Sequence, residues 1–139
     1  MRREETIEIE DRGTLLQFKI VEMSATQLES WIFRALLLLA SCGVEVPDGS
    51  DISAAAKYLQ HKGISALGSI DYNKAKPLLE ELLQCCYRIL PNNATQRVES
   101  STADGYISDV RTLLKLKWEA AKFNLSFFKD GGLFQSPQL

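Results

Sequence analysis

The stretch from Ser24 to Gly43 constrains the fold of this chain most, because it has the pattern of a long helix that is apolar on nearly all sides. Ser24 followed by Gln27 matches a capping box, and Gly43 is a typical helix stop. The main apolar residues recur at helical spacing, and they are Leu28, Trp31, Ile32, Ala35, Leu36 and Leu39. A helix with only a narrow polar strip needs cover on most faces. We therefore expect the rest of the chain, or a second subunit, to pack around it.

The residues before this helix alternate between apolar and polar on both sides of a turn signal. Ile7 and Ile9 alternate with glutamates, Phe18 and Ile20 alternate with polar residues, and the segment 11–13 lies between the two runs. This pattern predicts a β-hairpin over residues 5–21, with a three-residue loop that Gly13 closes. A lone hairpin is only marginally stable in water. We expect its apolar face to lie on the 24–43 helix or its strand to pair with another subunit.

Three further helices are predicted, over about residues 52–62, 72–89 and 103–129. Gly63 and Pro91 mark the ends of the first two, and residues 91–101 are polar and predict a loop. The predicted fold is mainly α (α+β), with the N-terminal β-hairpin packed on a four-helix array. We expect a single domain over residues 1–130 and a flexible C-terminal tail over residues 131–139.

The predicted 103–129 helix carries two apolar stripes. The first contains Ile107, Val110, Leu114, Trp118, Ala121, Leu125 and Phe128, and the second contains Leu113, Leu116, Ala120, Phe123 and Phe127. We expect the first stripe to face the core. The second predicts a surface for a partner or for self-association through Leu113, Leu116, Phe123 and Phe127. The alternative is that Phe123 or Phe127 packs under the hairpin or under the 91–101 loop.

Composition argues against several classes of function. Sixteen basic and 18 acidic residues give a net charge of -2, so no strong field favours nucleic acid or anionic lipid. The three cysteines are odd in number and lack a C-x-x-C pattern, which predicts reduced, buried thiols. The longest apolar run is about half of the roughly 20 residues that a spanning helix needs, so no membrane segment is expected. The first residues are not typical of a signal peptide.

No motif in the sequence predicts an enzyme, a metal site or a cofactor site. His61 is the only histidine, and a cysteine–histidine catalytic pair remains an alternative that nothing nearby supports. A helix-turn-helix over residues 57–74 fails at Leu59, where that motif needs a small residue, and at Ser69, where it needs an apolar one.

Four cations of the predicted 103–129 helix share one face, and they are Arg111, Lys115, Lys122 and Lys129. Nearby acidic residues dilute their charge, which favours a solvated surface over nucleic-acid contact. A DNA-binding regulator nevertheless stays open as a second class of function.

Several runs of the sequence resemble the tail assembly chaperones of long-tailed bacteriophages and prophages. These runs are T-I-E-I-E-D-R-G from residue 6, E-M-S-A-T-Q-L-E-S-W from residue 22, K-P-L-L-E-E-L-L from residue 76 and N-L-S-F-F from residue 124. The resemblance implies a non-enzymatic protein of the bacterial host cytoplasm that self-associates and holds the tape measure protein until the tail tube protein polymerises around it. It implies no cofactor, no nucleic acid and no membrane as partners. The alternative is a small DNA-binding regulatory protein of phage origin.

Overall fold

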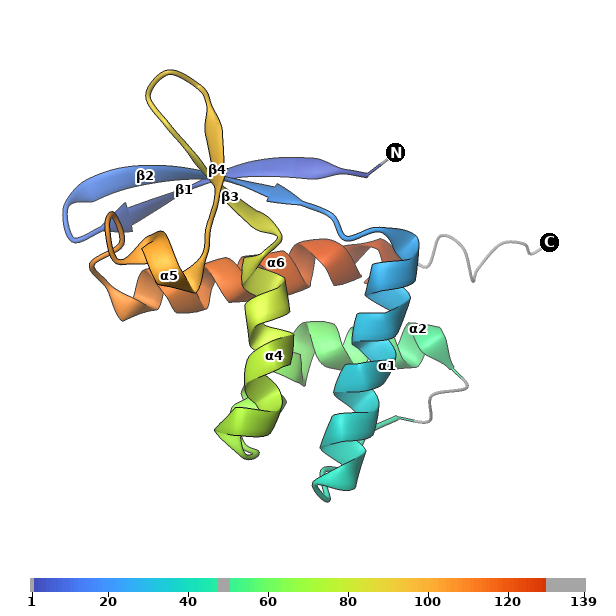
Figure 1. Ribbon diagram of the computed structural model, residues 1–139. Helices are drawn as coiled ribbons and strands as arrows, with labels where there is room; N and C mark the ends of the chain where they lie inside the picture. The colour runs from blue at the N-terminus through green and yellow to red at the C-terminus, as the bar shows by residue number, and fades with distance from the viewer. Residues whose placement is uncertain (1, 48–50, 130–139) are drawn as a thin grey trace.

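The computed structural model describes residues 2–47 and 51–129, with side chains up to Ser126 (Figure 1). The strands are β1 (Glu4–Asp11), β2 (Thr14–Val21), β3 (Cys86–Ile89) and β4 (Thr95–Arg97). The helices are α1 (Ala25–Ser41), α2 (Ile52–Tyr58), α3 (Ile64–Leu67), α4 (Tyr72–Leu83), α5 (Ser100–Ala103) and α6 (Val110–Lys129). A π-helical turn, η1 (Leu59–Gly63), joins α2 to α3.

The four strands form one antiparallel sheet in the order β1-β2-β3-β4. The predicted hairpin is present, but its loop is shorter than expected because Asp11 pairs with Thr14 at the end of the ladder. Arg12 and Gly13 are the two loop residues, and both have a positive φ, 48° and 89°, as a type I′ turn requires. One face of the sheet packs on the helices, and no helix of the described residues covers the other face (Figure 1).

The prediction of a mainly α fold with a lone hairpin is wrong, because the structure is an α+β fold with a four-stranded sheet. The predicted 72–89 helix ends at Leu83, and Cys86–Ile89 instead forms β3. The predicted 91–101 loop contains β4, and Asn93 takes a positive φ of 68° in the turn between the two strands. Residues 86–89 form a strand because β2 offers them an open edge, and ladder hydrogen bonds there replace the helical ones.

Helix α6 lies between the sheet and the other helices, so it is the central helix of the fold (Figure 1). β1 and β2 contact it on one side, and α2, η1 and α4 contact it on the other. The hairpin was expected to lie on the 24–43 helix or to pair with a strand of another subunit. Instead it contacts α6, and β2 pairs with β3 of the same chain. Helix α1 instead packs against α2, α3 and α4.

Two predicted boundaries are also wrong. The 103–129 helix starts later, at Val110, because the separate helix α5 is followed by a turn over residues 104–106 and an irregular segment over residues 107–109. Gly63 does not stop its helix, since its φ of -59° is helical and the chain continues through η1 into α3. The predicted tail over residues 131–139 lies outside the described residues.

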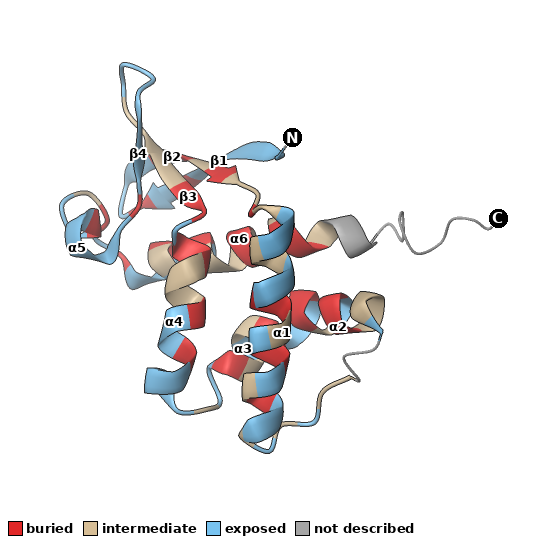
Figure 2. Cartoon of the chain, turned by 45° about the vertical axis from the view of Figure 1, so that its right-hand side comes forward, coloured by how far each residue is buried: buried red, intermediate tan, exposed pale blue. Residues whose placement is uncertain are grey.

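A single apolar cluster joins the sheet to the helices. Its largest fully buried side chains are Trp31, Phe18, Ile20, Ile32, Leu39, Leu59, Leu67, Leu82, Leu83, Leu116, Leu125 and Val98. Figure 2 shows that α1 and α4 each bury one side and expose the other. Within residues 2–47 and 51–129, no helix combines the length and the apolarity that crossing a bilayer requires.

The contact between α1 and α4 is fixed by a cluster of polar side chains around Glu81. Arg34 donates two hydrogen bonds to this carboxylate, at 2.8 and 2.9 Å, and Gln27 donates a third at 3.1 Å. Burial raises the pKa of Glu81, but these hydrogen bonds and the Arg34 charge lower it by more. The two helices are thereby held in one relative orientation, with Trp31 donating to the Leu78 carbonyl beneath them.

Candidate docking surface on helix α6

The structure does not bring Leu113, Leu116 and Phe123, three of the four residues predicted as a partner surface, together on an open face. Leu116 is 0% exposed and belongs to the core, and the Cys86 thiol donates to its carbonyl at 3.7 Å. Leu113 is partly buried and packs against the same core. Leu116 is therefore a packing residue, and it is not available to a partner.

Of the two phenylalanines of the predicted surface, Phe123 packs against other residues of the fold. Phe123 is partly buried, and the Arg3 guanidinium lies 4.9 Å from the centre of its ring. The same guanidinium donates to the Phe123 carbonyl at 3.1 Å. Phe123 thus packs beside the start of the hairpin, as the alternative interpretation held. The side chains of Phe127 and of Phe128, its neighbour on the other stripe, lie outside the described residues.

The exposed apolar side chains of α6 belong to the other stripe. Val110 is 65% exposed and Leu114 is 54% exposed, although both were expected to face the core. They lie on one row of the helix with Trp118, Ala121 and Leu125. Ala121 and Leu125 are buried, and α2, η1 and α4 contact α6, whereas the same row is exposed at Val110 and Leu114. The uncovered end of a core stripe is thus an apolar surface that the fold itself does not bury.

Basic side chains border this apolar row. Between Val110 and Trp118 the helix carries Arg111, Lys115 and Lys117 and no carboxylate. Arg111 pairs with Asp109 at 2.7 Å. The side chains of Lys115 and Lys117 make no hydrogen bond or ion pair with any residue that the structure describes.

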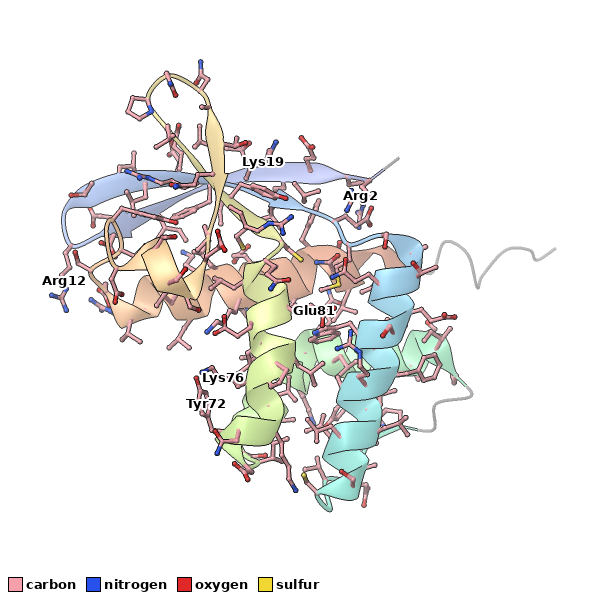
Figure 3. All side chains as sticks on the ribbon, in the orientation of Figure 1. Arg2, Arg12, Lys19, Tyr72, Lys76 and Glu81 are labelled. Carbon is pink, nitrogen blue, oxygen red and sulfur yellow. The ribbon has the colours of Figure 1, made fainter. Side chains whose placement is uncertain are left out.

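The basic border continues onto the hairpin. Arg12 and Lys115 line opposite sides of a groove of about 410 Å³ between the hairpin turn and α6, and Glu10 and Asp109 line it as well. Figure 3 shows Arg12 at the end of the hairpin, beside the start of α6. We call the set Arg12, Val110, Arg111, Leu114, Lys115, Lys117 and Trp118 the α6 docking surface.

A buried carboxylate holds the two sides of this groove together. Asp11 accepts hydrogen bonds from the backbone N–H of Ser108 at 2.8 Å and of Asp109 at 3.0 Å. It also accepts one from the Thr112 hydroxyl at 2.7 Å. The hydrogen bond from Ser108 is the main reason that the pKa of Asp11 lies below its ordinary value. These contacts fix the position of Arg12 relative to the start of α6.

Two of the three cysteines, Cys85 and Cys86, are buried. Burial raises the pKa of the Cys85 thiol to about 11, and it raises the pKa of the Cys86 thiol further. Neither thiol is therefore ionised at neutral pH, and neither has the reactivity of a nucleophile. His61 is exposed on η1. No group of three or more metal-ligating side chains occurs among residues 2–47 and 51–129.

Two signals in the sequence could have located the exposed end of the stripe. The run from Val110 to Trp118 lacks acidic residues, and of its cations only Lys115 has an acidic residue three or four positions away, at Glu119. Asp109 before Val110 is a helix-start signal, and it would have moved the predicted start of the helix from residue 103 to Val110.

A scan against models of protein families found no match to this chain, and searches among curated proteins and among solved structures found none either. The assignment of a function therefore depends on the sequence pattern and on the docking surface.

Proposed function

We propose that this protein is a tail assembly chaperone of a long-tailed bacteriophage or prophage, which holds the tape measure protein in the host cytoplasm before the tail tube protein assembles around it. The proposed function is not enzymatic. A tape measure protein is a long helical chain with apolar stripes, so its holder needs exposed apolar helix surface with few fixed polar contacts. The sequence runs that resemble this family supply the first support for the proposal.

The exposed pair Val110 and Leu114 is the observation that carries the proposal. Single exposed apolar residues are common on protein surfaces and need no explanation. These two lie on one row, one helical turn apart, and the row continues into the core through Ala121 and Leu125. A partner helix lying along α6 would bury them, as the fold already buries Ala121 and Leu125 further along the row.

Co-expression with the tape measure protein of the same phage or prophage tests this function. We expect the chaperone to raise the soluble fraction of the tape measure protein and to purify with it. The variant Val110→Gln/Leu114→Gln should lose most of this effect. Leu37→Gln is the matched control, because Leu37 is 68% exposed and lies on α1. A tape measure protein that stays insoluble and unbound beside the wild-type chain would rule the function out.

Self-association is part of the same proposal. The uncovered apolar row of α6 and the uncovered face of the sheet both leave room for a second copy. Light scattering after size exclusion should detect a species larger than a monomer at micromolar concentration. A monomer at all concentrations would remove this part of the proposal and leave the capture of the tape measure protein to be judged by co-expression.

A further inference from the structure

We infer that the α6 docking surface selects an amphipathic helix whose apolar stripe is bordered by aspartate and glutamate. This inference deepens the proposed function, and it rests on that function for the identity of the natural partner. The docking chemistry itself can be tested without that partner. The juxtaposition that carries it is an uncovered apolar row, Val110 and Leu114, next to cations from two separate elements of the fold.

The first step is the charge of the surface. The side chains of Lys115 and Lys117 have no carboxylate partner among the described residues. The Arg12 guanidinium makes no hydrogen bond there, and its charge is a minor cause of the lowered pKa of Asp109. Arg111 is paired with Asp109, and Asp109 and Glu10 are the carboxylates among the residues that line the groove. The Asp11 charge is buried and fully hydrogen-bonded. The unpaired charges on the surface are therefore mainly positive, which favours acidic partners and disfavours basic ones.

The second step is the shape of the surface. Val110 and Leu114 lie on one side of the exposed sector of α6, Lys115 lies on the other, and the half-buried Trp118 lies between them. A helix packed alongside at an axial distance of about 8–10 Å would cover this whole sector. Its apolar side chains would meet the row, and its carboxylates would reach Lys115 and Arg12. Aromatic and arginine side chains at the centre of such a contact commonly contribute most of the binding energy.

A helix fits this surface better than the other polyanions do. Duplex DNA would neutralise the lysines, but its phosphates would leave Val110 and Leu114 without apolar cover. An anionic membrane would cover both kinds of side chain. However, a membrane-binding helix commonly has a continuous basic face along its length, and on α6 Glu119 already pairs with Lys122 in the third turn.

Two synthetic helices of about 20 residues test the inference, with the same apolar stripe bordered by glutamate in one and by lysine in the other. Trp118 emission reports binding, because Trp31 is only 1% exposed. We expect the glutamate peptide to bind at least about tenfold more tightly at low salt, and about 0.5 M salt to reduce this preference. Trp118→Phe should abolish the signal, which verifies the reporter.

Charge and apolar variants separate the two parts of the surface. Lys115→Glu/Lys117→Glu should reverse the preference between the peptides, and Lys115→Gln/Lys117→Gln should remove it with an unchanged melting temperature. Val110→Gln/Leu114→Gln should weaken binding of both peptides, whereas Leu37→Gln should change neither. Equal affinity of the wild-type chain for the two peptides would overturn the inference. The inference would also be overturned if the wild-type chain were retained on duplex DNA and Lys115→Gln/Lys117→Gln were not. The surface would then bind phosphate groups.

The peptide result and the co-expression result can fail separately. A clear preference for the glutamate peptide beside an unbound tape measure protein would reject the proposed function and keep the docking chemistry. Capture of the tape measure protein without any preference between the peptides would reject the docking chemistry and keep the proposed function.

Discussion

The carboxylate of Asp11 accepts a hydrogen bond from the hydroxyl of Thr112 at 2.7 Å, which joins the end of β1 to the first turn of α6. The two residues are 101 positions apart in the sequence. Because Arg12 follows Asp11 directly, this contact also places Arg12 across the groove from Lys115. The fold and the docking surface thus depend on the same buried carboxylate.

Replacing Asp11 with asparagine should destabilise the fold at neutral pH. The amide keeps the shape of the side chain, but only one of its two polar atoms can accept the hydrogen bonds that Ser108, Asp109 and Thr112 donate. A buried donor left without an acceptor is costly. Denaturant unfolding at pH 7 checks this, with Glu8→Gln on the exposed side of β1 as the control. Equal stability of the two variants would mean that the network around Asp11 contributes little.

The same network predicts how stability depends on pH. The Ser108 N–H holds the pKa of Asp11 below its ordinary value, and the hydrogen bond from Arg111 lowers the pKa of Asp109 to about 2. A carboxyl group whose pKa is lower in the folded state stabilises the fold above its unfolded pKa and loses that contribution as the pH falls. The free energy of unfolding should therefore decrease between about pH 4 and about pH 2. Asp11→Asn should show a shallower decrease over this window.

Truncating Leu116 to alanine should cost much more stability than truncating Leu114, because Leu116 lies in the core and Leu114 lies on the docking surface. Leu116→Ala should cost about 2–5 kcal/mol, because it leaves a cavity at a residue that is 0% exposed. Leu114→Ala should change stability by no more than about 0.5 kcal/mol, since the side chain is 54% exposed. The two variants share one helix and one chemical change, so helix propensity is matched. Denaturant titration measures both, and similar losses would contradict the placement of these faces.

Local signals in the sequence were enough to predict part of the fold. The capping residue Ser24 and the stop at Gly43 mark the true ends of α1, because both act through contacts within one helical turn. The hairpin was predictable for a similar reason, since alternation and a turn residue act locally. The strand Cys86–Ile89 was not, because its pairing with β2 is a contact between segments far apart in the chain. Its hairpin partner could have been suspected from Asn92 and Asn93, which favour a turn with positive φ.

The docking surface was harder to predict than the fold. Both stripes of α6 are apolar, so periodicity alone cannot tell which of them is covered and over what length. Leu116 is 0% exposed, whereas Leu114, two positions earlier on the same helix, is 54% exposed. Both facts depend on tertiary packing. The absence of acidic residues between Val110 and Trp118 was the local signal that pointed to the correct end of the helix.

The buried thiols should react slowly with alkylating reagents. With a pKa of about 11, only about 0.1% of Cys85 is ionised at pH 8, and Cys86 is less ionised still. Cys42 is the partly exposed cysteine and should be modified first. Mass spectrometry of the native protein should detect one label per chain, and the unfolded protein should take three. Native labelling of Cys85 at the rate of Cys42 would contradict the buried environment seen here.

Replacing Arg12 with asparagine should stabilise the protein while weakening the docking surface. Arg12 holds a φ of 48° in a type I′ turn, a conformation that asparagine adopts more readily than residues with long side chains. We expect a gain of about 1 kcal/mol in the free energy of unfolding. The same change removes a cation from the groove, so the affinity for a glutamate-bordered helix should fall about threefold. Arg12→Lys is the matched control, because it keeps the charge and the unfavourable φ, and it should leave both stability and affinity close to those of the wild type. An asparagine variant that binds the acidic peptide as tightly as the wild type would show that Arg12 contributes nothing to docking.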